Sequence, residues 1–283
     1  MKPGDLAELV RLPAALTVPG DTLAGAAAAG WPDGRRTWAL PIASTLLYWA
    51  GMALNDYADR HVDAVERPER PIPSGRVRPR EALALAAALT ASGVTVAAWG
   101  GGRPALRVAL PLTGVIWCYD LVGRRGPLGP ALMAAARGLD VLMGAGGRRA
   151  AVLPALAVAT HTAGLTALSR GEVHGASPAT ARAAVATTLT AAVLGGLPRR
   201  ASPRPVLAPA LAALFAASTG RAQAAAARTP DADTVRAATG AGIRGMIPLQ
   251  ASLLARAGHP VAAVALVAAV PAARRGFRAV SPT

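Results

Sequence analysis

Four oxygen-bearing side chains recur at helical spacing near the end of an apolar segment. Asn55, Asp59 and Asp63 follow one another at intervals of four residues, and Asp56 precedes Asp59 by three. A helix therefore places all four on one face. The C-terminal end of a helix is unfavourable for acids, because the macrodipole is negative there and like charges four apart repel. The pattern indicates a bound cation, and oxygen ligands of this kind favour Mg²⁺.

A basic, proline-rich segment follows these acids. Its arginines are Arg67, Arg70, Arg76, Arg78 and Arg80, and its prolines are Pro68, Pro71 and Pro73. Proline restricts the backbone, and guanidinium groups bind phosphate oxygens well. Acids that hold a metal, opposed by arginines, outline a site for a diphosphate.

A simpler interpretation of the same residues stays open. The acids at a solvated helix end would pair with Arg60, Arg67 or Arg70, and the other arginines would only set membrane topology. Acids at the mouth of a membrane helix are more often functional, which favours the first interpretation.

Composition predicts that the helix carrying the acids lies in a membrane. The chain has 283 residues, of which 53% are hydrophobic and 16% charged, and its mean hydropathy is +0.37. Soluble domains carry about 25% charged residues. Three windows lack charged residues altogether, namely Thr37–Asn55, Ala82–Gly102 and Ala150–Ser169. Crossing a bilayer takes about 20 helical residues, so each window is long enough to span.

The sequence predicts an all-α, polytopic transmembrane bundle of about nine helices that forms one domain over residues 1–283. The expected helices are Glu8–Gly30, Arg36–Asp59, one from Pro79, Pro104–Val122, Leu128–Ala145, Arg149–Leu168, one from Pro178 and one from Pro203. Thr234–Arg256 and Pro260–Ala273 form one or two further crossings. Prolines at helix starts are favourable, because the first helical residue needs no N–H donor.

The charge balance points to lipid rather than nucleic acid. The formal net charge is +15, which in a soluble protein suggests nucleic-acid binding. Here the arginines flank apolar windows, as expected for lipid head groups and topology. We expect membrane lipids as partners, no nucleic acid and no obligate protein partner. Cys118 is the only cysteine, which excludes an intrachain disulfide.

The distribution of Lys and Arg also predicts the orientation. More of them fall on the side that carries the segment after Asp63, which favours that side as cytoplasmic. The pairs Arg148-Arg149 and Arg199-Arg200 lie on the other side and oppose this bias.

Two sequence runs carry a specific resemblance. The run Asn55–Asp63 reads NDYADRHVD, and Arg70–Arg76 reads RPIPSGR. Together they resemble the first signature of the UbiA superfamily of intramembrane prenyltransferases, and also its EboC-like branch. The resemblance implies a bundle of about nine helices with a lateral opening for a lipid tail. We expect the protein in a bacterial cell membrane, with the loops of the site on the cytoplasmic side. The resemblance also implies Mg²⁺-assisted transfer of a prenyl group from an allylic diphosphate donor to an aromatic or other small lipophilic acceptor.

The same resemblance implies roles for individual residues. Asn55, Asp56, Asp59 and Asp63 match as ligands of the metal and the diphosphate. The diphosphate contacts would include Arg70, Arg76, Arg137 and one or both of Arg124 and Arg125, because the run Tyr119–Arg125 is similar to a tyrosine and basic pair of the family.

Several other polar residues are candidates for lining a cavity. Asp21 interrupts the first helix beside Pro19 and Gly20, where a broken helix can face a cavity. Arg137 and Asp140 are three apart within one helix, so they either pair with each other or face the cavity. The remaining candidates are Tyr119, Asp120 and His174.

The second family motif is incomplete. The family pattern has two acids four apart after the sixth helix, whereas here Glu172 is followed by Ala176, which cannot bind a metal. Glu172 stands for the first acid as a catalytic candidate, and His174 is a poorer Mg²⁺ ligand. Either one metal suffices, or Asp120 or Asp140 compensates, or the protein binds a lipid without transferring it. A non-catalytic isoprenoid carrier or transporter and a structural membrane subunit are therefore the alternatives.

Overall fold

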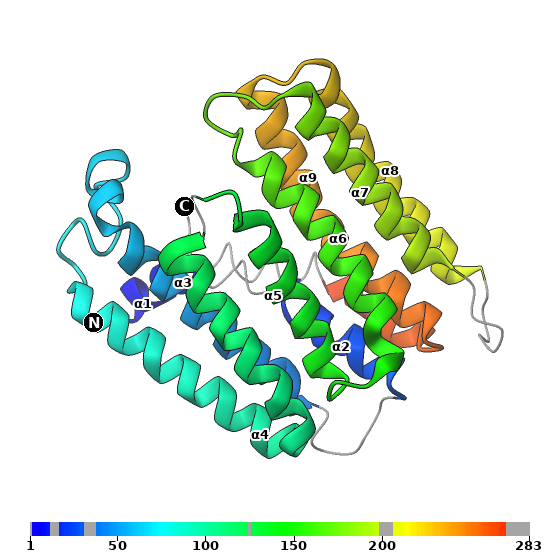
Figure 1. Ribbon diagram of the computed structural model, residues 1–283, viewed down its shortest axis with the longest axis horizontal. Helices are drawn as coiled ribbons and strands as arrows, with labels where there is room; N and C mark the ends of the chain where they lie inside the picture. The colour runs from blue at the N-terminus through cyan, green and yellow to red at the C-terminus, as the bar shows by residue number, and fades with distance from the viewer. Residues whose placement is uncertain (1, 12–16, 31–37, 124–125, 198–205, 270–283) are drawn as a thin grey trace.

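Helices account for all the regular secondary structure in the described part of the chain (Figure 1). The structure is a computed structural model that describes residues 2–11, 17–30, 38–123, 126–197 and 206–269. The elements are α1 (Pro3–Leu9), α2 (Pro19–Ala28), α3 (Ala39–Glu66), α4 (Pro79–Cys118), the π-helix η3 (Tyr119–Gly123), α5 (Gly129–Gly144), the 3-10 helix η4 (Arg149–Ala151), α6 (Val152–Ser169), α7 (Pro178–Gly196), α8 (Leu207–Arg228) and α9 (Ala232–Arg256). A further short helix covers Pro260–Ala269. The predicted all-α class is confirmed.

The prediction of a single helix over Glu8–Gly30 is wrong, because the structure has two helices in this part of the chain, α1 and α2. α1 ends at Leu9, and Arg11 takes a left-handed backbone conformation with φ of 48°. α2 begins at Pro19, whose ring cannot continue a preceding helix. The break puts Asp21 in the first turn of α2, where an acid suits the positive end of the macrodipole.

The second predicted helix is longer than expected. α3 begins at Ala39 and continues past Asp59 to Glu66. This extension keeps Asp63 on the helix and preserves the common face that its spacing predicts.

The helices expected from Pro79 and over Pro104–Val122 appear as two segments of α4, which turn back on one another at Gly102 (Figure 1). Gly102 has φ of 64° and ψ of −158°, a conformation that essentially only glycine adopts. The stretches 79–123 and 149–169 are long and apolar enough to cross a membrane. Only 22% of the most apolar window in the first stretch is buried inside the protein, so most of its apolar side chains face outward.

The bundle is built from small side chains packed at close range. α2 and α5 lie between α3–α4 on one flank and α6–α9 on the other (Figure 1). One core cluster joins Val141 of α5, Phe215 of α8 and Leu249 of α9 to many buried alanines. Another joins Leu47 of α3 to Leu112 of α4 and Met143 of α5. Small residues let helix backbones approach closely, which is how helices associate in lipid.

α2 and α5 pack closely against each other at two glycines. A Cβ added to Gly25 would lie 1.8 Å from the carbonyl oxygen of Val141, and one added to Gly144 would lie 2.1 Å from the carbonyl oxygen of Thr22. Backbone cannot move aside as a flexible side chain does. The contact therefore requires glycine at both positions.

Replacing Gly25 by alanine is expected to destabilise the bundle by about 1–3 kcal/mol, because it overpacks this contact. Thermal unfolding in detergent measures the change. Gly114→Ala is the matched control, since a Cβ there meets nothing within 4 Å. An equal melting temperature for the two variants would show that α2 and α5 do not pack as described.

Candidate active site

The four predicted metal ligands lie together on the C-terminal half of α3. Asn55, Asp56, Asp59 and Asp63 all belong to this helix, and their relative exposures are only 6, 5, 6 and 4%. Four buried polar side chains on one face would be strongly unfavourable without partners. The helix therefore presents an oxygen-rich face to the interior of the protein.

Two arginines from different segments neutralise this face. Arg11 Nη2 lies 3.0 Å from Asp56 Oδ1. Arg70 Nη1 lies 2.6 Å from Asp63 Oδ2 and 3.4 Å from the same Asp56 oxygen. Asp56 thus joins the segment before α2 to the segment after α3. Arg70 was predicted to belong to the site from its place in the basic segment, whereas Arg11 was not among the predicted site residues.

The simpler interpretation was that the acids pair with Arg60, Arg67 or Arg70 at a solvated helix end. Arg70 pairs with the acids, as that interpretation expects. Arg60 instead packs over the ring of Tyr57 at 4.5 Å and donates to the carbonyl oxygen of Tyr57.

Asp120 extends the polar face across to a second element. Asn55 Nδ2 donates to Asp120 Oδ1 at 3.2 Å, and Asp120 is buried. Asp120 and Tyr119 lie in the π-helix η3, which continues α4 within the range predicted to be helical, Pro104–Val122. Wide turns of this kind are frequent at functional sites. The predicted diphosphate contacts Arg124 and Arg125 lie outside the described residues.

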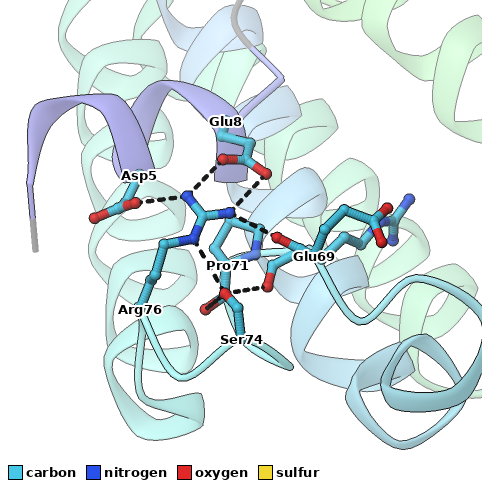
Figure 2. A network of polar contacts seen from close by, with 7 residues as sticks. Asp5, Glu8, Glu69, Pro71, Ser74 and Arg76 are labelled. Carbon is cyan, nitrogen blue, oxygen red and sulfur yellow. Dashed lines mark hydrogen bonds and ion pairs between the residues drawn. The ribbon is translucent and has the colours of Figure 1, made fainter.

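Arg76 holds α1 through its guanidinium group, which lies among Asp5, Glu8 and Ser74 (Figure 2). Its guanidinium pairs with Asp5 at 2.7 Å and with Glu8 at 2.8 Å, and it also donates to Ser74 Oγ and the carbonyl oxygen of Glu69. The hydrogen bonds that Arg76 donates to Glu8, and then those to Asp5, raise the pKa of Arg76 above its ordinary value. Arg76 was predicted to be a diphosphate contact. In the structure its donors are taken up by α1, so it is not brought together with the aspartate face as Arg70 is.

Replacing Arg76 by glutamine is expected to loosen α1, and with it the nearby Arg11. Hydrogen exchange over residues 3–9 should become faster, because α1 loses the ion pairs that hold it to the segment after α3. The exposed Arg80→Gln in the same segment is the control. Unchanged exchange over residues 3–9 would contradict the anchoring role of Arg76.

A second buried cluster joins α2, α5 and α9. Arg137 Nε lies 2.7 Å from Asp21 Oδ2, and Asp21 is completely buried. Gln250 Nε2 donates to Asp21 Oδ1 at 2.7 Å and to the carbonyl oxygen of Thr17 at 2.6 Å. These contacts hold the first turn of α2 and the backbone of Thr17 just before it against α5 and α9. Gln250 had no signal in the sequence, because its partners lie more than two hundred residues away.

Arg137 and Asp140 do not pair with each other. Arg137 turns to Asp21, and Asp140 accepts a hydrogen bond from Ser44 at 2.6 Å. Asp140 is buried, and its Oδ1 has no hydrogen-bond partner among the described atoms. Both charges face the interior of the bundle, and the pair between Arg137 and Asp140 that their spacing allows does not form.

The connection between α6 and α7 carries the residues of the incomplete second motif. It lies at the same end of the bundle as the C-terminal end of α3 (Figure 1). Glu172 is half-buried, and His174 is exposed. Ala176 uses its backbone N–H to bond the carbonyl oxygen of Pro230. This connection is therefore tied to the α8–α9 turn and offers one carboxylate.

The donor set suits Mg²⁺ in its chemistry. Three carboxylates and an amide line one buried face, and the guanidinium groups of Arg11 and Arg70 stand there as the positive partners. In the described part of the chain, no three His, Cys, Asp or Glu side chains converge tightly enough to hold a metal alone. A metal here would therefore share its coordination with phosphate oxygens and water, as Mg²⁺ commonly does.

A model of the UbiA prenyltransferase family matches residues 16–171, which include the aspartate face, Asp120 and Arg137. The chain belongs to the UbiA prenyltransferase family. The predicted family and fold are thereby confirmed, whereas the assignment to the EboC-like branch stays a prediction.

Related sequences match part of the chain. The chain is 35% identical to the digeranylgeranylglyceryl phosphate synthase of Natronomonas pharaonis over 158 residues, which cover 54% of this chain and 57% of that protein. It is 39% identical to the bacteriochlorophyll synthase 34 kDa chain of Chloroflexus aurantiacus over 113 residues, or 38% of this chain and 36% of that one. The chain thus matches about half, or less, of the length of these curated relatives.

Solved structures share the fold over most of the chain. A UbiA homologue from Archaeoglobus fulgidus, bound to GPP and Mg²⁺, aligns with a TM-score of 0.64 at 13% identity and covers 86% of this chain and 99% of its own. The apo UbiA homologue of Aeropyrum pernix K1 aligns with a TM-score of 0.64 at 22% identity, covering 84% and 96%. At these identities the comparison concerns the fold of the helix bundle.

Proposed function

We propose that this protein transfers a prenyl group from an allylic diphosphate to a lipophilic acceptor within the membrane. The observation that carries this proposal is the buried face of Asn55, Asp56, Asp59 and Asp63, opposed by arginines from two other segments. A neutral lipid needs no such concentration of charge. A diphosphate bound through a divalent cation does.

The residues of this face divide the work of ionising the donor. Asn55, Asp56, Asp59 and Asp63 would hold Mg²⁺, which when bound neutralises part of the charge that develops on the leaving diphosphate. Arg11 and Arg70 donate to the phosphate oxygens that the metal does not bind. Without a donor bound, the same guanidinium groups pair with carboxylates of α3, which accept hydrogen bonds in the same way as phosphate oxygens. The C–O bond of the donor breaks with its electron pair on the diphosphate. The allylic cation then accepts an electron pair from the acceptor, which loses a proton as the new bond forms.

The acceptor class that we propose first is a glyceryl phosphate lipid with a free hydroxyl group. Several relatives are named as digeranylgeranylglyceryl phosphate synthases, and one of them shares 35% identity over 158 residues. An aromatic acceptor is the second candidate. In the first case the new bond is an ether C–O bond, and in the second it is a C–C bond.

A non-catalytic isoprenoid carrier is the alternative function. Ala176 stands where the family pattern has its second acid, and Glu172 is left as one carboxylate on that side. A protein with one intact motif retains a means of binding a diphosphate lipid. Binding without bond cleavage would then be its activity.

Turnover by the purified full chain separates these functions. The protein in lipid nanodiscs receives radiolabelled dimethylallyl, geranyl or geranylgeranyl diphosphate, together with glyceryl phosphate lipids or aromatic acceptors. We expect diphosphate release and a prenylated acceptor with Mg²⁺, and neither product after chelation with EDTA. Saturable donor binding with no product from any acceptor would favour the carrier.

A further inference from the structure

Arg11 takes a backbone conformation that its residue type rarely adopts. Its φ is 48°, and among the described residues it is the only one besides glycines with a positive φ. Arg11 directly follows Val10, the C-cap of α1, at a position where glycine is usual because other side chains are strained there. Strain of this kind persists where the surrounding structure enforces it, and it is concentrated at ligand sites. An arginine at this position therefore indicates a use for its side chain.

The side chain of Arg11 reaches from the surface to the buried acids. Its Nη2 lies 3.0 Å from Asp56 Oδ1 and 3.5 Å from Asn55 Oδ1. The side chain of Arg11 is 39% exposed, whereas that of Asp56 is 6% exposed. The guanidinium group of Arg11 thus stands at the aspartate face, where a bound diphosphate would meet it.

The position of Arg11 depends on α1, which is anchored at two points. α1 has seven residues, and a helix of this length is not stable by itself. Leu9 is fully buried in a core cluster that joins α1 to α3 and α4. Arg76 pairs with both acids of α1, Asp5 and Glu8 (Figure 2). These contacts decide where α1 lies, and α1 in turn determines where Arg11 lies.

The contacts of Arg76 form a network rather than one surface ion pair. Nη1 donates to Asp5 at 2.7 Å and to Glu8 at 2.8 Å, and Nη2 donates to the other oxygen of Glu8 at 3.1 Å. Nη2 also donates to the carbonyl oxygen of Glu69 at 2.8 Å. A guanidinium that holds a carboxylate through two nitrogens fixes its geometry better than a single contact does. Arg76 therefore ties α1 to the segment that carries Arg70, the other arginine of the aspartate face.

We propose that Asp5, Glu8 and Arg76 are positioning residues of the diphosphate site, which hold α1 so that Arg11 faces Asp56. This inference rests on the proposed function, because that function assigns Arg11 to the phosphate oxygens. Coupling between two binding events is reciprocal. A diphosphate that binds more tightly when α1 is in place must therefore also hold α1 in place more firmly.

Binding of an unreactive donor, combined with hydrogen exchange, tests this proposal. The purified full chain in lipid nanodiscs is titrated with geranyl thiodiphosphate and Mg²⁺, and exchange over residues 3–9 is measured with and without this ligand. We expect the ligand to slow exchange over residues 3–9. Glu8→Arg should speed that exchange and weaken the affinity about tenfold, the effect of losing a charge-assisted hydrogen bond. Adding Arg76→Glu to Glu8→Arg restores opposite charges and should recover part of the affinity.

Arg11→Gly separates the guanidinium group from the position of α1. Glycine adopts the left-handed conformation without strain, so exchange over residues 3–9 should be no faster than in the unsubstituted chain. The affinity should nevertheless fall about tenfold or more, because the contact to the phosphate oxygens is lost. Arg80→Gln removes an exposed charge from the segment that carries Arg76. It is the control and should change neither the exchange nor the affinity.

Three results would overturn the proposal. Faster exchange in Glu8→Arg at unchanged affinity would mean that the anchor of α1 does not position Arg11. Unchanged affinity in Arg11→Gly would remove Arg11 from the phosphate oxygens. Exchange over residues 3–9 that the ligand does not slow would show that α1 and the site are not coupled, and this result needs no variant to fold. Absence of any Mg²⁺-dependent site in the unsubstituted chain would instead contradict the proposed function itself.

Discussion

Replacing Asp56 by asparagine is expected to lower the rate of prenyl transfer by at least about 10²-fold, the usual effect of removing one electrostatic contact to a transition state. Asp56 Oδ1 lies 3.0 Å from Arg11 and 3.4 Å from Arg70, so it joins the two arginines that we assign to the diphosphate. Asparagine keeps the size of the side chain but not its charge. The variant loses one metal ligand of full charge and one anchor for both guanidinium groups.

The control for this variant lies on the same helix. Glu66→Gln makes the same chemical change at the exposed last residue of α3 and should leave the rate within about two-fold, as expected for a solvated surface charge. Product formation from labelled donor measures both variants, and thermal unfolding checks that each is folded. Equal rates for the two variants would remove Asp56 from the reaction.

Replacing Arg137 by methionine is expected to destabilise the bundle by about 3–5 kcal/mol, since it leaves a buried charge without its partner. The partner is Asp21, which is fully buried and lies 2.7 Å from Arg137 Nε. Gln250 still donates to the other oxygen of Asp21, but an amide carries no compensating charge. The loss should appear in unfolding of the detergent-solubilised protein by heat or denaturant.

A double variant separates charge from packing at this cluster. Asp21→Leu combined with Arg137→Met should recover most of the stability, because a buried ion pair replaced by apolar residues is often neutral. Arg182→Met on the exposed face of α7 is the control for the loss of an arginine. If Arg137→Met unfolds at the same temperature as this control, the ion pair between Arg137 and Asp21 does not stabilise the packing of α2 on α5.

Local spacing was enough to predict the aspartate face. The intervals between Asn55, Asp59 and Asp63 depend only on helix geometry, and α3 extends to Glu66 and so keeps them aligned. The same holds for helices that start at Pro79 and Pro178, where proline occupies the first helical position. These features lie within one element, so a local pattern contains them.

Contacts between distant segments could not be predicted in this way. Arg11 reaches Asp56 across 45 residues, and Gln250 reaches Asp21 across 229. Arg76 follows the basic pattern as closely as Arg70 does, but α1 places Asp5 and Glu8 beside it and takes up its donors. The contacts of Arg11 and Arg76 both depend on α1 ending at Leu9. Because of this end, α1 and Arg11 lie over the C-terminal half of α3, where Arg11 meets Asp56 and α1 meets Arg76.

Binding of a donor that cannot react tests the central claim most directly. The claim is that the buried face of α3 binds a prenyl diphosphate through Mg²⁺. Isothermal titration of the purified chain with geranyl thiodiphosphate should show one site in the presence of Mg²⁺, little heat after chelation, and loss of that site in Asp59→Asn. Equal binding with and without Mg²⁺, unchanged in Asp59→Asn, would show that the aspartates of α3 do not hold the diphosphate.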